Sequence, residues 1–194
     1  MHHKYAALFF ALLLLTGCKS VPTHTHFENI NIPEYDAHEL LLGEVFASAQ
    51  IEPKSGSHAA GRAWFAKSKD GIQILVVTKH LMPGLHGIHI HEKGDCSAKD
   101  ASSAGPHYNP SKHKHGTADP HKYHMGDLGN IVISNKGVGI LNLGIPASDH
   151  SAHTNWQDII GRSIVLHGGV DDLASQPAGD SGSRIGCGLI KKDR

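Results

Sequence analysis

The stretch Gly84-Leu85-His86-Gly87-Ile88-His89-Ile90-His91 decides the fold of this chain. From Ile88 to His91, apolar and imidazole side chains alternate, which is the period of a β-strand. Side chains at i and i+2 of a strand point the same way, so His89 and His91 share one face and the two isoleucines take the other. Two neutral imidazoles held side by side make half of a tetragonal nitrogen site of the kind that copper prefers. Taken alone, the pair would equally suit a half-buried strand with two solvated histidines.

The composition points to one domain that is rich in possible metal ligands. The chain has 194 residues, a length that favours a single domain with a tail. Its 18 basic and 18 acidic residues balance, so no overall field would attract nucleic acid. Histidine is unusually frequent, at 18 residues. This enrichment raises the expectation of metal binding but does not choose the metal.

The first residues are typical of an export signal. A short basic start, residues 1–4, precedes an apolar run of about eleven residues, which is too short to span a bilayer and suits a signal-peptide core. Leu15-Thr16-Gly17-Cys18 then resembles the cleavage box of bacterial lipoproteins. We expect a signal peptide over residues 1–17, cleavage before Cys18 and a lipid on its thiol; ordinary cleavage with a free Cys18 is the alternative. The expected location is the bacterial cell envelope, as a periplasm-facing lipoprotein anchored in a membrane.

Beyond the signal, the sequence predicts a tether and then an all-β domain. Residues 18–38 contain scattered Pro, Asn and Thr without an apolar period, which indicates a tether. From residue 39 to 194, short strand-like runs are separated by Gly- and Pro-containing turns. The predicted runs are Leu40–Ala47, Gly61–Ala66, Ile72–Val77, Ile88–His91, Asn130–Ile133, Val138–Leu143, Ser163–His167 and Ile185–Ile190. About eight short strands without an amphipathic helix indicate an antiparallel sandwich or barrel.

Two long stretches, about 92–128 and 168–183, do not fit a strand pattern. Loops of this length in a compact domain are usually functional or disordered. The first contains three histidines and one aspartate that together suit a closed tetrahedral zinc site: His107, His115, His124 and Asp127. His167 ends the apolar run 164–166, where a strand would place it at the edge of a site.

These features together resemble the copper/zinc superoxide dismutase family over roughly residues 40–190. The motifs that carry the resemblance are Gly84–His91, Ala104–Pro110, His115-Gly116, His124–Asn130, Gly161–His167 and Gly182–Gly188. The resemblance implies a Greek-key antiparallel β-sandwich, or flattened barrel, of about eight strands with two long functional loops. Both this architecture and turnover close to the diffusion limit are known in this family, so the resemblance implies them for this chain.

The resemblance also implies one copper and one zinc ion per chain. The implied copper ligands are His89, His91, His107 and His167, and the implied zinc ligands are His107, His115, His124 and Asp127. His107 belongs to both sets and would be the bridging imidazolate, since an imidazolate has two basic nitrogens.

Four further residues take roles from the same resemblance. Asp171 matches an aspartate that links a copper ligand to a zinc ligand, and such carboxylates fix imidazole orientation. Arg184 matches the arginine beside the copper that attracts and orients the superoxide anion. Cys96 and Cys187 match the family disulfide. His86 has a poor spacing for a ligand, and we expect it to be a structural, hydrogen-bonded histidine.

The implied activity is the dismutation of superoxide to dioxygen and hydrogen peroxide, with copper cycling between Cu(II) and Cu(I) and zinc in a structural role. In the envelope this would protect against external superoxide. A periplasmic copper store or carrier is the alternative, but a store needs neither the anion-guiding Arg184 nor the shared His107. A structural sandwich that has lost its chemistry would lack ligands, and none is missing. The sequence leaves monomer and homodimer both open.

The first-loop lysines allow two interpretations of how the substrate anion is steered to the site. The second loop contains no lysine, so Arg184 is the cation next to it. Lys112 and Lys114 flank His113 just before His115 and form one hypothesis for a steering pair. The other is that the lysines of the first loop are solvated surface residues.

Overall fold

The computed structural model describes residues 40–69, 71–116, 123–146 and 155–193. The expected signal peptide, the lipidated Cys18 and the tether lie outside the described residues, so they stay predictions. Among the described residues, no helix is long and apolar enough to cross a membrane.

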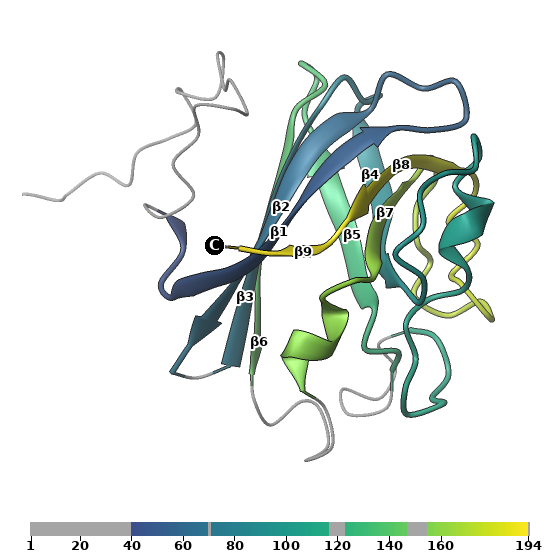
Figure 1. The fold of residues 1–194 in the computed structure, drawn as a ribbon. Coiled ribbons are helices and arrows are strands. Elements are labelled where there is room, and N and C mark those ends of the chain that lie inside the picture. The colour runs from purple at the N-terminus through teal and green to yellow at the C-terminus, as the bar shows by residue number, and fades with distance from the viewer. Residues whose placement is uncertain (1–39, 70, 117–122, 147–154, 194) are drawn as a thin grey trace, which may run out of the picture.

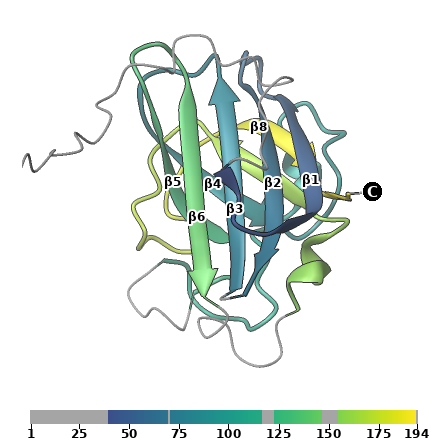
Figure 2. The same cartoon turned by 90° about the vertical axis from the view of Figure 1, so that its left-hand side faces the viewer.

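Nine described strands form one antiparallel sheet that closes on itself (Figures 1 and 2). They are β1 (Glu44–Pro53), β2 (Ala60–Ser68), β3 (Gly71–Lys79), β4 (Gly84–His91), β5 (Asp127–Ile133), β6 (Gly139–Pro146), β7 (Ser163–His167), β8 (Arg184–Leu189) and β9 (Lys191–Lys192). The spatial order is β2-β3-β6-β5-β4-β7-β8-β1-β9, and pairing of β1 with β2 completes the barrel. The connections from β3 to β4 and from β6 to β7 cross over rather than join neighbours, which is the Greek-key pattern. The predicted all-β fold is confirmed.

Several strand boundaries differ from the sequence prediction, among them those of β1 and β4, and one strand was not predicted. β1 begins at Glu44 rather than Leu40 and continues to Pro53, because Ala49 and Ile51 extend its inward-facing row beside β2. β4 begins at Gly84, where Leu85 to Gly87 pair with β5. β9 was not predicted, since two exposed lysines carry no apolar signal. It exists because it pairs with β1 at Ala47 and Ser48.

The interior of the barrel is filled by the apolar residues of alternating strands. Ile88 and Ile90 of β4 are fully buried in the main core, together with Phe65 and Ile74. Burial of one such side chain stabilises the fold by about 1.5–3 kcal/mol. Since β4 turns its isoleucines inward, the histidines between them must lie on the outer face of the barrel. This is the packing reason for the position of the site.

Two long connections lie over that outer face: one comprises the described residues 92–116 and 123–126, and the other is 168–183 (Figure 1). The first contains a short 3-10 helix, η2 (Ser102–Ala104). Another, η3 (Trp156–Ile159), precedes β7. The expected disulfide is confirmed: Cys96 in the first loop bonds Cys187 in β8 across 91 residues of sequence. In the chain-entropy model, closing a loop of this length stabilises the fold by about 4–5 kcal/mol.

Candidate metal centre

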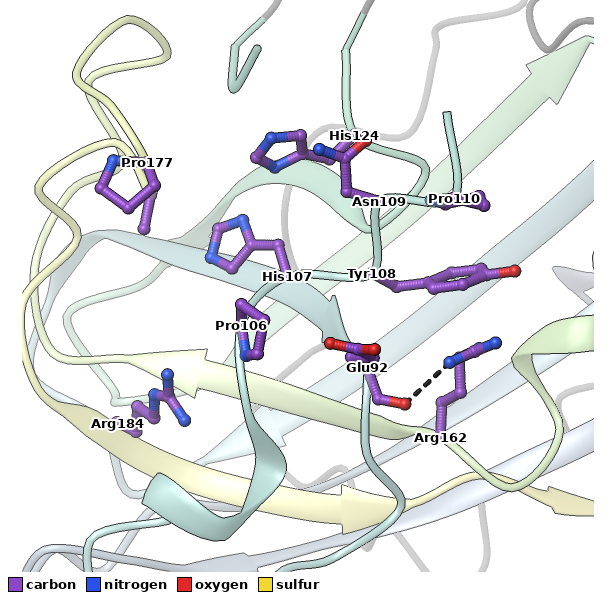
Figure 3. Close-up of a pocket in the computed structure, with 11 residues that line it drawn as sticks. Glu92, Pro106, His107, Tyr108, Asn109, Pro110, His124, Arg162, Pro177 and Arg184 are labelled. Carbon is purple, nitrogen blue, oxygen red and sulfur yellow. Dashed lines mark hydrogen bonds between the residues drawn. The ribbon is translucent and has the colours of Figure 1, made fainter. Parts of the chain in front are cut away.

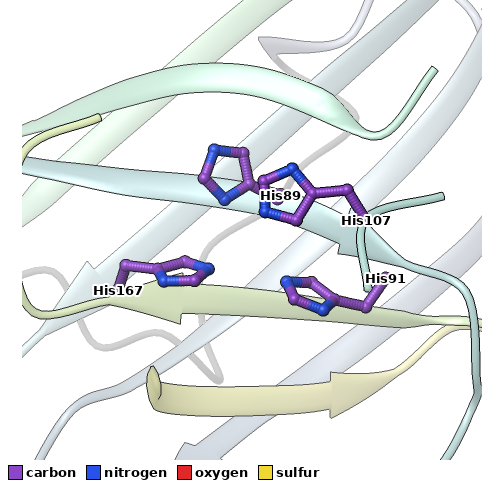
Figure 4. Close-up of side chains that lie close together, drawn as sticks. All are labelled: His89, His91, His107 and His167. Atoms are coloured by element: carbon purple, nitrogen blue, oxygen red, sulfur yellow. The ribbon is translucent and has the colours of Figure 1, made fainter. Parts of the chain in front are cut away.

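Four histidines from three segments meet on the outer face of the barrel (Figure 4). His89 and His91 come from β4, and His167 ends β7. His107 comes from the first long loop, which an isolated β-bridge between His91 and His107 holds against the strand. All four side chains are buried, and their ligand nitrogens lie within 4.8 Å of one another.

In each of these four imidazoles, one buried ring nitrogen has no hydrogen-bond partner. These atoms are His89 Nδ1, His91 Nε2, His107 Nε2 and His167 Nε2. The opposite ring nitrogens are bonded: His89 Nε2 lies 2.7 Å from Asp171 Oδ2, and His91 Nδ1 lies 2.8 Å from the Gly105 carbonyl oxygen. A buried polar atom without a partner costs about 1–3 kcal/mol. A metal ion that accepts four nitrogen lone pairs would remove that cost, and copper prefers such donors.

Burial keeps three of these imidazoles neutral. It lowers the pKa of His91 to about 2 and that of His167 to about 3, and neighbouring imidazoles add to the effect. Burial also lowers the pKa of His107 to about 4, although Asp127 opposes the shift. At neutral pH the three rings therefore offer lone pairs without first losing a proton.

A second cluster shares His107 and is arranged around the carboxylate of Asp127. Asp127 Oδ1 lies 2.8 Å from Nδ1 of His107, 3.0 Å from Nδ1 of His115 and 3.2 Å from Nδ1 of His124. Ligands of a tetrahedral zinc ion with bonds near 2.0 Å are about 3.3 Å apart. These donor atoms thus already have close to the spacing and chemistry that zinc requires.

The other oxygen of Asp127 fixes the carboxylate in place. Oδ2 accepts hydrogen bonds from the backbone N–H groups of Gly116 and His124, each at 3.2 Å. Burial alone would raise the pKa of Asp127, but the three imidazoles around it, His107 first, hold it well below its usual range. The carboxylate is therefore charged and directed at the imidazoles.

Asp171 connects the two clusters. Its Oδ2 pairs with Nε2 of His89 at 2.7 Å, and its Oδ1 pairs with Nε2 of His115 at 2.9 Å. Burial would lower the pKa of His115, yet Asp127 and Asp171 together raise it to about 9. The side chain of Asn130 in β5 holds the backbone of Asp171 with bonds of 2.8 and 2.9 Å. The sequence motif contains Asn130, but no sequence signal gave it this role.

The second loop can approach so closely because it has glycine at a critical position. Gly179 adopts φ +67, and a Cβ there would lie 1.9 Å from Asp171 Oδ1 and 2.6 Å from His115 Nε2. Any larger residue at position 179 would therefore separate Asp171 from His115.

The predicted structural role of His86 also agrees with its contacts. Its Nδ1 lies 2.9 Å from the His167 carbonyl oxygen, and its Nε2 lies 2.9 Å from that of Met82. His86 therefore joins the chain before β4 to the end of β7 and is not part of either cluster.

Arg184 lines the pockets next to the four-histidine cluster, together with His107. Its Nη1 donates to the Ala101 carbonyl at 2.8 Å, in the segment that the disulfide ties to β8. Burial lowers the pKa of the guanidinium from its ordinary value. An arginine nevertheless stays charged at neutral pH.

Two adjoining pockets, of about 690 and 400 Å³, share the lining residues His107, Pro177, Ala178 and Arg184. Figure 3 shows the lining of the larger one. Arg162 lines the larger one on the side away from Arg184; it donates to the Glu92 carbonyl at 2.7 Å and stacks 3.5 Å from the centre of the Tyr108 ring. Lys112 and Lys114 are exposed and are not among the described residues that line either pocket.

The fold and the two clusters that share His107 define a β-barrel protein with two possible metal sites, one of which has the all-nitrogen donor set that suits copper. Residues 59–190 match the model of the copper/zinc superoxide dismutase family. The chain is 37% identical to superoxide dismutase [Cu-Zn] 1 of Aquifex aeolicus, across 78% of this chain and 90% of that protein. It is 36% identical to superoxide dismutase [Cu-Zn] of Onchocerca volvulus, across 70% and 90%, and to extracellular superoxide dismutase [Cu-Zn] of Brugia pahangi, across 67% and 68%.

The chain belongs to the copper/zinc superoxide dismutase family. Members of this family are oxidoreductases that use copper and zinc, and both clusters described above could hold such ions.

Proposed function

We propose that this protein dismutates superoxide, with copper bound by His89, His91, His107 and His167 and zinc bound by His107, His115, His124 and Asp127. One observation carries the proposal. Six buried ring nitrogens without hydrogen-bond partners fall into two clusters. His107 joins the clusters, because its unpartnered Nε2 faces one of them and its Nδ1 lies against Asp127 in the other. A single copper store would need no second cluster and no shared ring.

The protein side chains divide the work of this reaction. Copper, when bound, supplies one-electron chemistry between Cu(II) and Cu(I), whereas zinc has no accessible redox change. One superoxide loses an electron and leaves as dioxygen; another gains an electron and two protons and leaves as hydrogen peroxide. His107 Nε2 is the atom at which the chain can hold a proton between these two half-reactions, because its Nδ1 stays against Asp127 at 2.8 Å.

Arg184 gives the pocket its attraction for the substrate. Superoxide is a small anion, and a fixed positive charge beside the site raises its local concentration and its rate of encounter. Arg162 contributes a second guanidinium to the same lining. Both charges come from arginines that backbone carbonyls hold in place, at Ala101 and Glu92.

Stepwise metal loading tests the proposed activity. Metal-free protein is loaded with zinc alone, copper alone or both, and superoxide dismutation is measured for each form. We expect no activity with zinc alone and the highest activity with one copper and one zinc per chain. A fully loaded protein that binds both metals but shows no dismutation would favour the copper store instead.

We also propose that the protein works in the bacterial cell envelope, held by a lipid on Cys18 and facing the periplasm, where it removes external superoxide. The box Leu15–Cys18 and the apolar run before it support this location. Cys18→Ala should release the protein from the membrane fraction or block its maturation. Wild-type protein found wholly in the soluble fraction, with a free Cys18 thiol, would refute the anchor. A homodimer stays a prediction, which sedimentation velocity tests.

A further inference from the structure

The imidazole of His167 faces a hydroxyl in the second loop. His167 Nδ1 lies 3.0 Å from Ser181 Oγ and 3.3 Å from the Gly182 carbonyl oxygen. Ser181 Oγ also lies 3.0 Å from the Ala178 carbonyl oxygen. Ser181 is buried, with only 2% of its surface exposed, so water does not easily replace these partners.

The acceptors in this group fix the direction of every hydrogen bond. Carbonyl oxygens only accept, so the hydroxyl proton of Ser181 goes to Ala178 and its oxygen remains free to accept. The Gly182 carbonyl beside Nδ1 likewise requires a proton on that nitrogen. His167 therefore donates from Nδ1, and its Nε2 carries the lone pair that faces the four-histidine cluster.

The backbone around Ser181 holds the hydroxyl in this position. The Ser181 carbonyl accepts from the N–H of Gly169 at 2.9 Å, and the Ser183 carbonyl accepts from the N–H of Gly168 at 2.7 Å. Gly87 of β4 packs so closely that a Cβ there would lie 2.9 Å from Ser181 Cβ. The loop consequently presents the hydroxyl to His167 from a nearly fixed point.

We propose that Ser181 is a positioning residue that sets the tautomer and the ring plane of His167 through this hydroxyl relay, and thereby tunes the copper site. The inference rests on the proposed function, since it takes His167 as a copper ligand. The three proposed copper ligands that are not shared with zinc have different sets of partners: a carboxylate at His89, a carbonyl at His91, and a hydroxyl together with a carbonyl at His167. Partners of this kind orient metal-bound imidazoles and adjust their basicity.

Ser181→Ala tests the proposal because it removes the hydroxyl and keeps Cβ. The exposed neighbour Ser183 provides the matched control, Ser183→Ala, and Ser181→Thr retains a hydroxyl. Copper affinity of the zinc-loaded protein is measured by chelator competition, and the ligand field by Cu(II) electron paramagnetic resonance. We expect Ser181→Ala to bind copper about tenfold more weakly and to show a shifted Cu(II) spectrum. Loss of a hydrogen-bond partner of a metal-bound histidine typically lowers metal affinity about 10- to 100-fold, and the smaller effect is expected here because the Gly182 carbonyl still accepts from His167. Ser183→Ala and Ser181→Thr should keep the wild-type spectrum.

Two results would overturn the proposal. One is a Ser181→Ala variant with wild-type copper affinity and an unchanged Cu(II) spectrum. The other is loss of zinc together with copper, which would mean that Ser181 supports the loop as a whole rather than His167. Failure of the proposed function itself would look different, since the wild-type protein would then bind no copper or show no dismutation.

Discussion

Gln176 joins the two long loops through the backbone of His115, and its removal should weaken zinc binding. Oε1 of Gln176 accepts from the His115 N–H at 2.8 Å, and Nε2 donates to the His115 carbonyl at 2.9 Å. Each such bond contributes about 0.5–1.5 kcal/mol, and these two are partly exposed, so their joint loss should cost about 1–2 kcal/mol. If that energy serves to hold His115 ready for zinc, Gln176→Ala should lower the zinc affinity by about 5- to 30-fold.

Competition with a fluorescent zinc indicator measures this change on metal-free protein. Gln176→Glu should lose at least as much affinity, because a carboxylate oxygen would face the His115 carbonyl where the amide now donates. Gln157→Ala, at an exposed position in η3, is the matched control and should bind zinc like the wild type. A Gln176→Ala variant within twofold of the wild-type affinity would refute the reasoning.

Further predictions concern the metal ligands, the effect of pH and the disulfide. His167→Ala should abolish copper-dependent turnover and keep one zinc per chain, whereas Asp127→Ala should lose zinc affinity and keep some copper-dependent activity; equal loss of both metals in both variants would contradict the two-site assignment. In the metal-free protein, His115 keeps its proton up to about pH 9, because its pKa is raised from 6.5. The protonated imidazole therefore stabilises the fold; this contribution is fully present below pH 6.5 and is lost as the pH rises through about 9. Because zinc must displace that proton, apparent zinc affinity should fall about tenfold per pH unit from pH 8.5 to 7 in titrations, and copper affinity should fall less. Replacing both Cys96 and Cys187 by Ser should lower the free energy of unfolding by about 2–5 kcal/mol in urea titrations.

Much of the fold was predictable because local patterns dictate it. The alternation at Ile88–His91 places the isoleucines inward and the histidines outward, and the barrel has this arrangement. Strand β9 was not predictable, because its two exposed lysines, Lys191 and Lys192, show no apolar pattern and form a strand only by pairing with β1. Nor does alternation reveal that the outer face of β4 is buried. That burial comes from the two long loops, which cover histidines that a bare strand would leave solvated.

The resemblance predicts the ligand residues, and the structure brings them together in two clusters, whereas their supporting partners could not be predicted. Gln176 and His115 are separated by 61 residues, and one side of their contact is backbone, which leaves no pattern in the sequence. Ser181 reaches His167 only because glycines allow the second loop to fold back over β7. Such contacts depend on the tertiary path of a loop, and no periodicity encodes that path.

Anomalous diffraction from crystals of the metal-loaded protein tests the central claim most directly. Data collected at the copper and zinc absorption edges locate each element independently of the protein model. The account predicts a copper peak bounded by His89, His91, His107 and His167, and a zinc peak bounded by His107, His115, His124 and Asp127, with the His107 ring between them. A copper peak away from the four histidines, or one peak with no second metal on the other side of His107, would contradict it.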